Sequence, residues 1–196
     1  AGHANLDLAQ PDPKEDMIRN RDPNTVMLAD SGGFQIAKGV WPGRWADFTD
    51  KKSEAQREKV LKWQMGIATY GMTMDIPTWT FRDPVAAQAC GIFSYDDAVR
   101  ATQYNNEFWI ANRYGDTKIL NVLQGGNHAE ADHWYDLMKS YCDPKRNPDR
   151  HFNGWGMGGQ NMCDVHLVLK RLVHLIHDGL LEKGVHDWMH FLGTSK

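Results

Sequence analysis

Short strand-like runs alternate with longer helical stretches along the chain, and this alternation restricts the possible folds more than any other feature. Five short runs, each stopped by Gly, Pro or Asp, predict strands at 26–29, 71–76, 119–123, about 154–158 and 188–192. The stretches between them predict helices at 53–70, about 94–114, about 129–141 and 165–176. Strands that alternate with helices in this way indicate βαβ units and a parallel sheet.

Local signals support the helices. Ser53 lies three residues before Gln56, the spacing of a capping box, and Ser94 is the expected N-cap of the second helix. The helix after the fourth strand is expected to be the longest. It carries one apolar face, as in a helix that packs on a core, formed by Val165, Val168, Leu169, Leu172 and Ile176.

Two architectures fit this pattern: an open doubly wound sheet and a (β/α)8 TIM barrel. A barrel has eight strands in typically about 250 residues. The 196 residues of this chain predict five strands, so a barrel would be incomplete. We expect residues 1–25 to form an N-terminal polar segment and residues 26–196 to form the central part of such a barrel.

Composition excludes several classes of protein. The net charge is −3, unlike a strongly cationic nucleic-acid-binding protein, although seven Lys or Arg in 38–62 form either a solvated helix face or a phosphate-contacting edge. No apolar run approaches the roughly 18 residues of a membrane span, and the N-terminus does not resemble a signal peptide. Cys90, Cys142 and Cys163 are too widely spaced for a disulfide framework or a zinc knuckle. We expect a cytoplasmic protein with buried thiols, no membrane association and no metal site.

Chemically useful residues follow the predicted strands. They are Asp30, Asp75, Gln124, Gly158, Gly159 and Leu192. Gly and Asp also make ordinary turns, so any one of these positions could be purely structural. Because the carboxyl ends of parallel strands meet at one edge, where ligands bind in α/β folds, we expect these residues to converge on a site.

The residue types at this edge suit a planar, polar ligand. In the run Asp30-Ser31-Gly32-Gly33-Phe34-Gln35, Phe34 could stack on a ring and Asp30 could act as acid, base or nucleophile. Asp75 ends an otherwise apolar strand, where burying a carboxylate without a role would be costly. Gln124 offers a donor and an acceptor, as recognition of a nucleobase edge requires.

Four motifs in order resemble the tRNA-guanine transglycosylase family, the queuine tRNA-ribosyltransferases. They are residues 30–35, Val122-Leu123-Gln124-Gly125-Gly126, Gly156-Met157-Gly158-Gly159 and Phe191-Leu192-Gly193. The resemblance spans about residues 26–193 and implies a (β/α)8 barrel. It also implies a pentosyltransferase that exchanges guanine in tRNA for a free 7-deazaguanine base, so the implied partners are nucleic acid and a free base.

The resemblance implies a role for each predicted site residue. Asp30 matches the acid/base aspartate beside the glycosidic bond, while Phe34 and Leu192 match the residues that cover the two faces of the base. Asp75 and Gln124 match the side chains that hydrogen-bond the guanine edge. Ser31, Gly158 and the backbone N–H of Gly159 are implied to complete substrate binding.

The sequence also departs from the family pattern. The second aspartate, which is the family nucleophile, and the Cys-x-Cys-x-x-Cys zinc site are absent, so we expect no cofactor and at most weak guanine binding from residues 1–196. Ile76 and Pro77 replace the usual Glu and Cys, and Gln160 replaces a Leu. Three alternatives remain: exchange on DNA, as in the phage DNA-guanine transglycosylases of the same superfamily; a non-catalytic base- or nucleic-acid-binding module; and an unrelated α/β enzyme.

Overall fold

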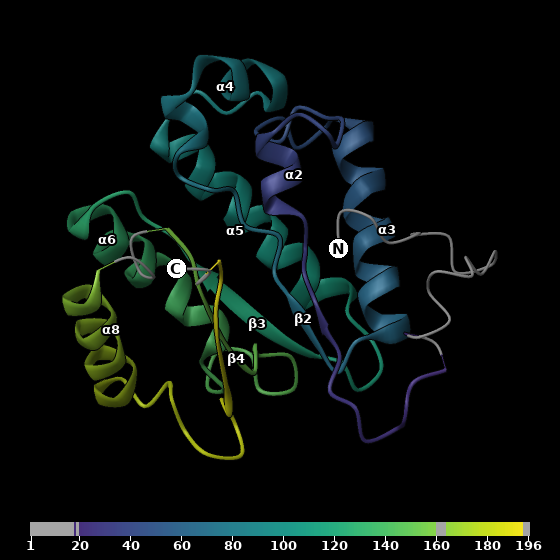
Figure 1. Ribbon diagram of the computed structural model, residues 1–196, viewed down its shortest axis with the longest axis vertical. Helices are drawn as coiled ribbons and strands as arrows, with labels where there is room; N and C mark the ends of the chain where they lie inside the picture. The colour runs from purple at the N-terminus through teal and green to yellow at the C-terminus, as the bar shows by residue number, and fades with distance from the viewer. Residues whose placement is uncertain (1–17, 19, 160–163, 194–196) are drawn as a thin grey trace.

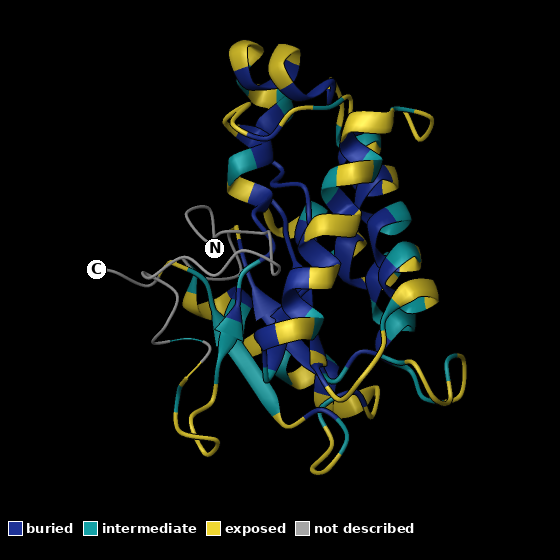
Figure 2. Ribbon diagram, turned by 90° about the vertical axis from the view of Figure 1, so that its right-hand side faces the viewer, coloured by how far each residue is buried: buried dark blue, intermediate teal, exposed yellow. Residues whose placement is uncertain are grey.

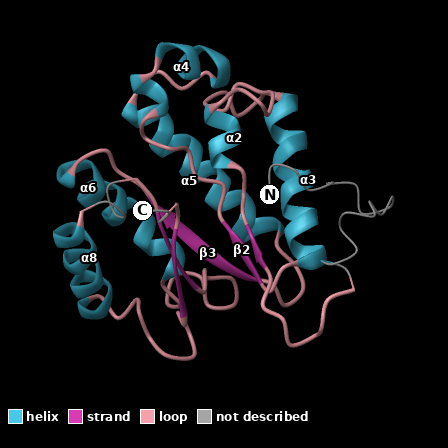
Figure 3. Ribbon diagram, in the orientation of Figure 1, coloured by secondary structure: helices cyan, strands magenta, loops and turns pink. Residues whose placement is uncertain are grey.

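A five-stranded, all-parallel sheet forms the centre of the molecule. The computed structural model describes residues 18, 20–159 and 164–193. Each strand pairs with the next one along the chain, so the order in the sheet equals the order in the sequence. Figure 3 shows the strands in magenta among the helices. The strands are β1 (Leu28–Ala29), β2 (Tyr70–Met72), β3 (Lys118–Leu123), β4 (Gly154–Met157) and β5 (Trp188–Phe191).

This order excludes one of the two architectures. A doubly wound sheet reverses its strand order at a switch point. In this sheet every new strand is added to the same edge, which gives the curled arrangement of a half-barrel. The described residues therefore form an α/β fold around a curled, five-stranded half-barrel sheet. All five predicted strands are present, although the ladders of β1 and β2 are shorter than predicted.

Helices cover the sheet and connect its strands (Figure 1). Four of them occupy the predicted stretches, and α6 and α8 lie next to each other. The elements are α2 (Gly33–Ala37), α3 (Lys51–Ile67), η2 (Thr80–Arg82), α4 (Pro84–Cys90), α5 (Tyr95–Asn112), α6 (His128–Met138), η3 (Lys139–Cys142) and α8 (Val165–His177).

Several local predictions need correction. Helix α3 begins earlier than predicted, because the Asp50 carboxylate accepts the hydrogen bond from the Ser53 amide, so Asp50 and not Ser53 is the N-cap. Ser94 does cap α5. Helix α5 has 18 residues and α8 has 13, so α8 is not the longest helix. Helix α4 was not predicted, although Asp83 followed by Pro84 is a typical helix start.

The predicted apolar face of α8 is largely exposed: of its five residues only Val168 and Leu172 are half-buried, and none is fully buried. Val165, Leu169 and Ile176 are more than half exposed, as is Val173 beside them. The buried positions are Leu167, Arg171 and Leu175. Arg171 is fully buried because it donates to Asp132 and its guanidinium lies 4.4 Å from the ring of Tyr135. An ion pair with α6 therefore replaces an apolar contact.

The two faces of the sheet bury different clusters. The larger cluster lies between the sheet and the helices, and includes Trp109, Trp134 and Trp155. A smaller one contains alternate strand residues from the opposite face, including Tyr70, Leu120 and Trp188. Strands β2 and β4 are buried along their length, whereas β5 is half-buried (Figure 2).

One buried amide joins the first two strands to the helical layer. The Gln64 Nε2 on α3 lies 3.4 Å from the Ala29 carbonyl oxygen and 2.9 Å from that of Met72, and donates to both. Its Oε1 accepts a 2.9 Å hydrogen bond from the Trp109 indole of α5. A Cβ on Gly71 would lie 2.9 Å from Gln64, so the glycine provides the space. Gln64 thus ties the ends of β1 and β2 to α3 and α5.

Other predictions concern single residues. Cys90 and Cys142 are buried free thiols, as expected, and Cys163 and Gln160 lie outside the described residues. Most of the predicted 1–25 segment also lies outside them. Trp41 and Trp45 are buried, so they pack onto the fold. Within the described ranges no helix has the length and apolar character needed to cross a bilayer.

Candidate functional site

The predicted site residues meet in one cavity at the carboxyl edge of the sheet. The cavity has a volume of about 620 Å³, within the usual range for small-molecule sites. Every predicted site residue except Ser31 lines it. Its other lining residues are Gly33, Pro77, Thr78, Trp79, Arg82, Gly125, Gly126 and Gly193. The prediction that these strand ends converge is confirmed.

Asp30 follows β1 directly and is held by the backbone after it. Its Oδ1 accepts hydrogen bonds from the amides of Ser31, at 2.7 Å, and Gly32, at 3.3 Å. Gly32 has a φ of 83°, and a Cβ there would lie 2.2 Å from the Trp41 ring. Only glycine fits this turn, which directs the half-buried Asp30 carboxylate into the cavity.

Phe34 and Asp75 come together because Gly33 has no side chain. A Cβ on Gly33 would lie 2.4 Å from the carbonyl oxygen of Asp75. Phe34, on the first turn of α2, is 56% exposed and lines the cavity. An aromatic ring left this accessible beside a buried carboxylate can cover the face of a planar ligand.

The segment that carries Asp75 is fixed by side chains from α5. The Asn105 amide donates to the Met74 carbonyl oxygen at 2.6 Å, and the Thr102 hydroxyl accepts from the Ile76 amide at 3.0 Å. The backbone after Met72 therefore leaves the β-ladder, while its N–H and C=O groups still have hydrogen-bond partners. This explains why β2 is shorter than predicted while Asp75 still reaches the cavity.

Asp75 is a buried carboxyl with a raised pKa. Burial raises the pKa of Asp75 to about 7, the hydrogen bond from Gln124 opposes this shift, and the charge of Asp30 adds to it. Gln124 Nε2 donates to Asp75 Oδ2 at 2.6 Å. A carboxyl group that titrates near neutral pH can accept hydrogen bonds as an anion or donate one as an acid.

Two glycines form the wall against Gln124. A Cβ on Gly158 would lie 2.7 Å from Gln124 Nε2, and one on Gly159 would lie 3.0 Å from its Oε1. Gly159 also has a φ of 57°, in the region that favours glycine. The close approach of this backbone holds the Gln124 amide in one plane at the bottom of the cavity.

Ser31 is placed differently from the prediction. It is buried, its hydroxyl oxygen has no hydrogen-bond partner among the residues that the structure describes, and it does not line the cavity. Its backbone amide, however, supports the Asp30 carboxylate. In this structure Ser31 contributes to the site through Asp30.

Trp79 and Arg82 belong to the cavity wall and were not predicted. Arg82 forms an ion pair with Glu130 and donates to the Thr78 carbonyl oxygen at 2.6 Å. Trp79 lies beside Phe34, with ring centroids 6.1 Å apart. An aromatic residue and a cation in the loop after Asp75 were the available signal, because the loops after parallel strands line ligand sites.

His190 adds a titratable group to the face of the sheet that carries the smaller cluster. It lies two residues from both Trp188 and Leu192, which pack in that cluster, so the three side chains point to the same face. Burial lowers the pKa of His190, while the charge of Asp30 acts in the opposite direction. Among the described residues no group of three or more His, Cys, Asp or Glu is arranged to hold a metal ion.

The arrangement combines a half-buried carboxylate, a buried carboxyl–amide pair and an exposed aromatic ring. It can bind a flat ligand by its polar edge and transfer a proton at an adjacent bond. Comparison of the chain with known protein families, with curated proteins and with solved structures found no match.

Proposed function

We propose that this protein binds guanine and exchanges it in a nucleic acid, as the resemblance to tRNA-guanine transglycosylases implies. The observation that carries the proposal is the Asp75–Gln124 pair, which lies in the same cavity as Asp30 and Phe34. On this proposal the sheet is part of a (β/α)8 barrel, and the cavity lies at the edge where barrel enzymes bind substrates.

The polar pair complements guanine. The guanine edge presents the O6 acceptor and N–H donors, so an ionised Asp75 accepts from the donors and the Gln124 amide donates to O6. Adenine presents a donor where guanine has O6, which would leave buried polar groups mismatched. Phe34 covers one face of the base and Leu192 the other, and both residues line the cavity.

Asp30 supplies proton transfer on this proposal. It protonates the guanine nitrogen as the bond from that nitrogen to the anomeric carbon breaks. It then removes the proton from the nitrogen of the incoming 7-deazaguanine base as that nitrogen bonds to the same carbon. Two backbone amides hold its carboxylate. The exchange resembles that of a retaining glycosidase in which a second base replaces water; its covalent step needs a second carboxylate, and the resemblance matches no residue of 1–196 to that role.

Guanine binding is the first test. We expect calorimetry to detect guanine and 7-deazaguanine but to give at least about a tenfold weaker affinity for adenine. Asp75→Ala and Gln124→Ala should each weaken guanine binding, while Asp96→Ala, on the exposed first turn of α5, should leave it unchanged. If guanine does not bind, the proposal is wrong.

Exchange is the second test. Because the covalent step needs a second carboxylate, labelled guanine should enter tRNA in the presence of a chain that also carries one, and Asp30→Asn should abolish incorporation. The same assay with duplex DNA identifies the polymer. Guanine binding without incorporation into either polymer would favour a base-binding module over an exchange enzyme.

A further inference from the structure

An aromatic and cationic rim lies at the mouth of the cavity. Phe34 lies on the first turn of α2, and Lys38, four residues later, is the C-cap of this helix; the two side chains therefore share one face. Lys38 Nζ lies 5.6 Å from the centroid of the Phe34 ring and 5.2 Å from that of Trp79. The rim defined by Phe34, Lys38 and Trp79 thus places one ammonium group against two rings.

Folding alone does not account for the exposure of this rim. Phe34 is 56% exposed, Trp79 is half-buried and Lys38 is exposed, although each apolar ring would gain stability from burial. Throughout the described ranges, Lys38 has no carboxylate within ion-pair distance, whereas Arg82 is paired with Glu130. Lys38 is therefore the cation at the mouth whose charge is available to an anionic ligand.

The geometry of the two rings assigns them to different partners. For one base to stack between two rings, the rings must be parallel and about 7 Å apart, because each of the two stacking contacts spans about 3.5 Å. The Phe34 and Trp79 rings are inclined at 54° with centroids 6.1 Å apart, so one base cannot stack on both. If Phe34 covers the base in the cavity, the Trp79 face remains for a second planar group outside it.

We propose that Trp79 and Lys38 form a subsite for the nucleotide next to the target guanine: Trp79 stacks on the flanking base, and Lys38 contacts the phosphate between them. The inference rests on the proposed function and deepens it, because it predicts a single-stranded nucleic acid as the substrate instead of a free nucleoside. Aromatic stacking combined with a cation on the backbone is the usual chemistry of single-strand binding.

The test compares a trinucleotide with the free base. Calorimetry measures the dissociation constants of guanine and of a trinucleotide with a central guanosine flanked by adenosines, in RNA and DNA forms. The readout is the ratio of trinucleotide to guanine affinity. We expect Trp79→Ala to lower this ratio about tenfold, the scale of one lost base stack, and Trp79→Phe to retain most of it.

Lys38 gives an independent readout. In Lys38→Ala the trinucleotide affinity should depend less steeply on salt, by about 0.7 in the logarithmic slope, as expected for one phosphate contact on a single strand. Lys59→Ala, which removes an exposed lysine from α3, is the matched control and should leave both the ratio and the slope unchanged. With a trinucleotide whose flanking nucleotides lack bases, Trp79→Ala should no longer change the affinity ratio, whereas Lys38→Ala should still reduce the salt slope.

The outcomes separate the two proposals. If wild-type protein does not bind guanine, both the proposed function and the subsite fail. If guanine binds but Trp79→Ala, Trp79→Phe and Lys38→Ala all retain the wild-type ratio and slope, only the subsite is wrong. An effect in one polymer alone supports the subsite and identifies that polymer as the substrate class.

Discussion

The amide of Gln124 donates a 2.6 Å hydrogen bond to the carboxylate of Asp75, and this contact joins the ends of two neighbouring strands inside the cavity. Burial nevertheless keeps the pKa of Asp75 at about 7. The state of the site therefore changes near neutral pH. An anionic Asp75 accepts hydrogen bonds from two N–H groups, whereas a protonated Asp75 accepts less and donates one.

We predict that guanine affinity increases as the pH rises through the pKa of Asp75. Below about pH 7 the affinity should fall by up to about tenfold per pH unit, because binding then requires removal of the carboxyl proton. Calorimetry between about pH 5.5 and about pH 8 measures this dependence, and Asp75→Asn should remove it. A wild-type affinity that stays constant over this range would contradict the assignment of Asp75 to the N–H groups.

Asp75 also affects stability. A carboxyl whose pKa is raised in the folded state binds more protons there than in the unfolded chain, so stability declines as the pH rises from about 4 to about 7. We predict that Asp75→Asn, which retains an acceptor for Gln124, raises the free energy of unfolding by roughly 1–3 kcal/mol at about pH 8. Urea denaturation at this pH and at about pH 4, where the difference should vanish, tests the prediction.

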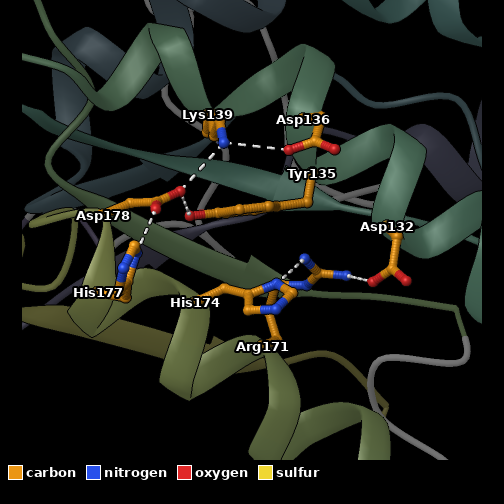
Figure 4. A network of polar contacts seen from close by, with 8 residues as sticks. All are labelled: Asp132, Tyr135, Asp136, Lys139, Arg171, His174, His177 and Asp178. Atoms are coloured by element: carbon orange, nitrogen blue, oxygen red, sulfur yellow. Dashed lines mark hydrogen bonds and ion pairs between the residues drawn. The ribbon is translucent and has the colours of Figure 1, made fainter.

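The pKa of Asp178 is shifted in the opposite direction, below its usual value. Its carboxylate accepts from His177, Lys139 and Tyr135 (Figure 4). These hydrogen bonds, led by that of His177, lower its pKa to about 2 against the effect of burial. The stabilisation is present above about pH 4 and is lost as the pH falls toward about 2.

We therefore predict that Asp178→Asn lowers the free energy of unfolding by on the order of 1 kcal/mol at neutral pH and has little effect near about pH 2. Asp136→Asn is the matched control, since the Asp136 side chain is 64% exposed and, within the described part of the chain, its ion pair is with Lys139 alone. Denaturation curves at both pH values measure the difference. Equal losses for the two variants at neutral pH would show that the Asp178 network adds no stability.

We predict that Gly158 matters more for ligand affinity than for the stability of the fold. An alanine Cβ at 2.7 Å from Gln124 Nε2 would displace the amide, so we expect Gly158→Ala to weaken guanine binding at least about tenfold. Gly115→Ala is the control. Gly115 has a φ of 66° but open space around it, so that variant loses about 1 kcal/mol of stability and no affinity. Equal guanine affinities in both variants would refute this role of Gly158.

The orientation of α8 can be tested by substitutions on its two faces. Leu169 is 55% exposed, so Leu169→Lys should change the free energy of unfolding by no more than about 0.5 kcal/mol. Leu167 is fully buried, and Leu167→Ala should cost about 2–4 kcal/mol. A large loss from Leu169→Lys with little loss from Leu167→Ala would mean that the helix packs by its apolar face after all.

The sequence predicted the elements and the convergence of the site better than it predicted local packing. Asp30, Asp75 and Gln124 could be placed because strand ends meet at one edge whatever the details of the loops. Trp79 could not, because its position depends on how η2 folds back beside α2. Pattern alone also misled for α8, where the fully buried Arg171, paired with the half-buried Asp132, lies on the packed face in place of part of the predicted apolar stripe.

Gln64 has a consequence for the chemistry of the cavity. By donating to the last residues of β1 and β2 it ties the chain segments that lead to Asp30 and Asp75 to the helical layer. The charge of Asp30 contributes to the high pKa of Asp75. The two carboxyl groups that act on each other are therefore anchored in part from the helical layer behind the sheet, by a side chain that no ligand in the cavity needs to touch.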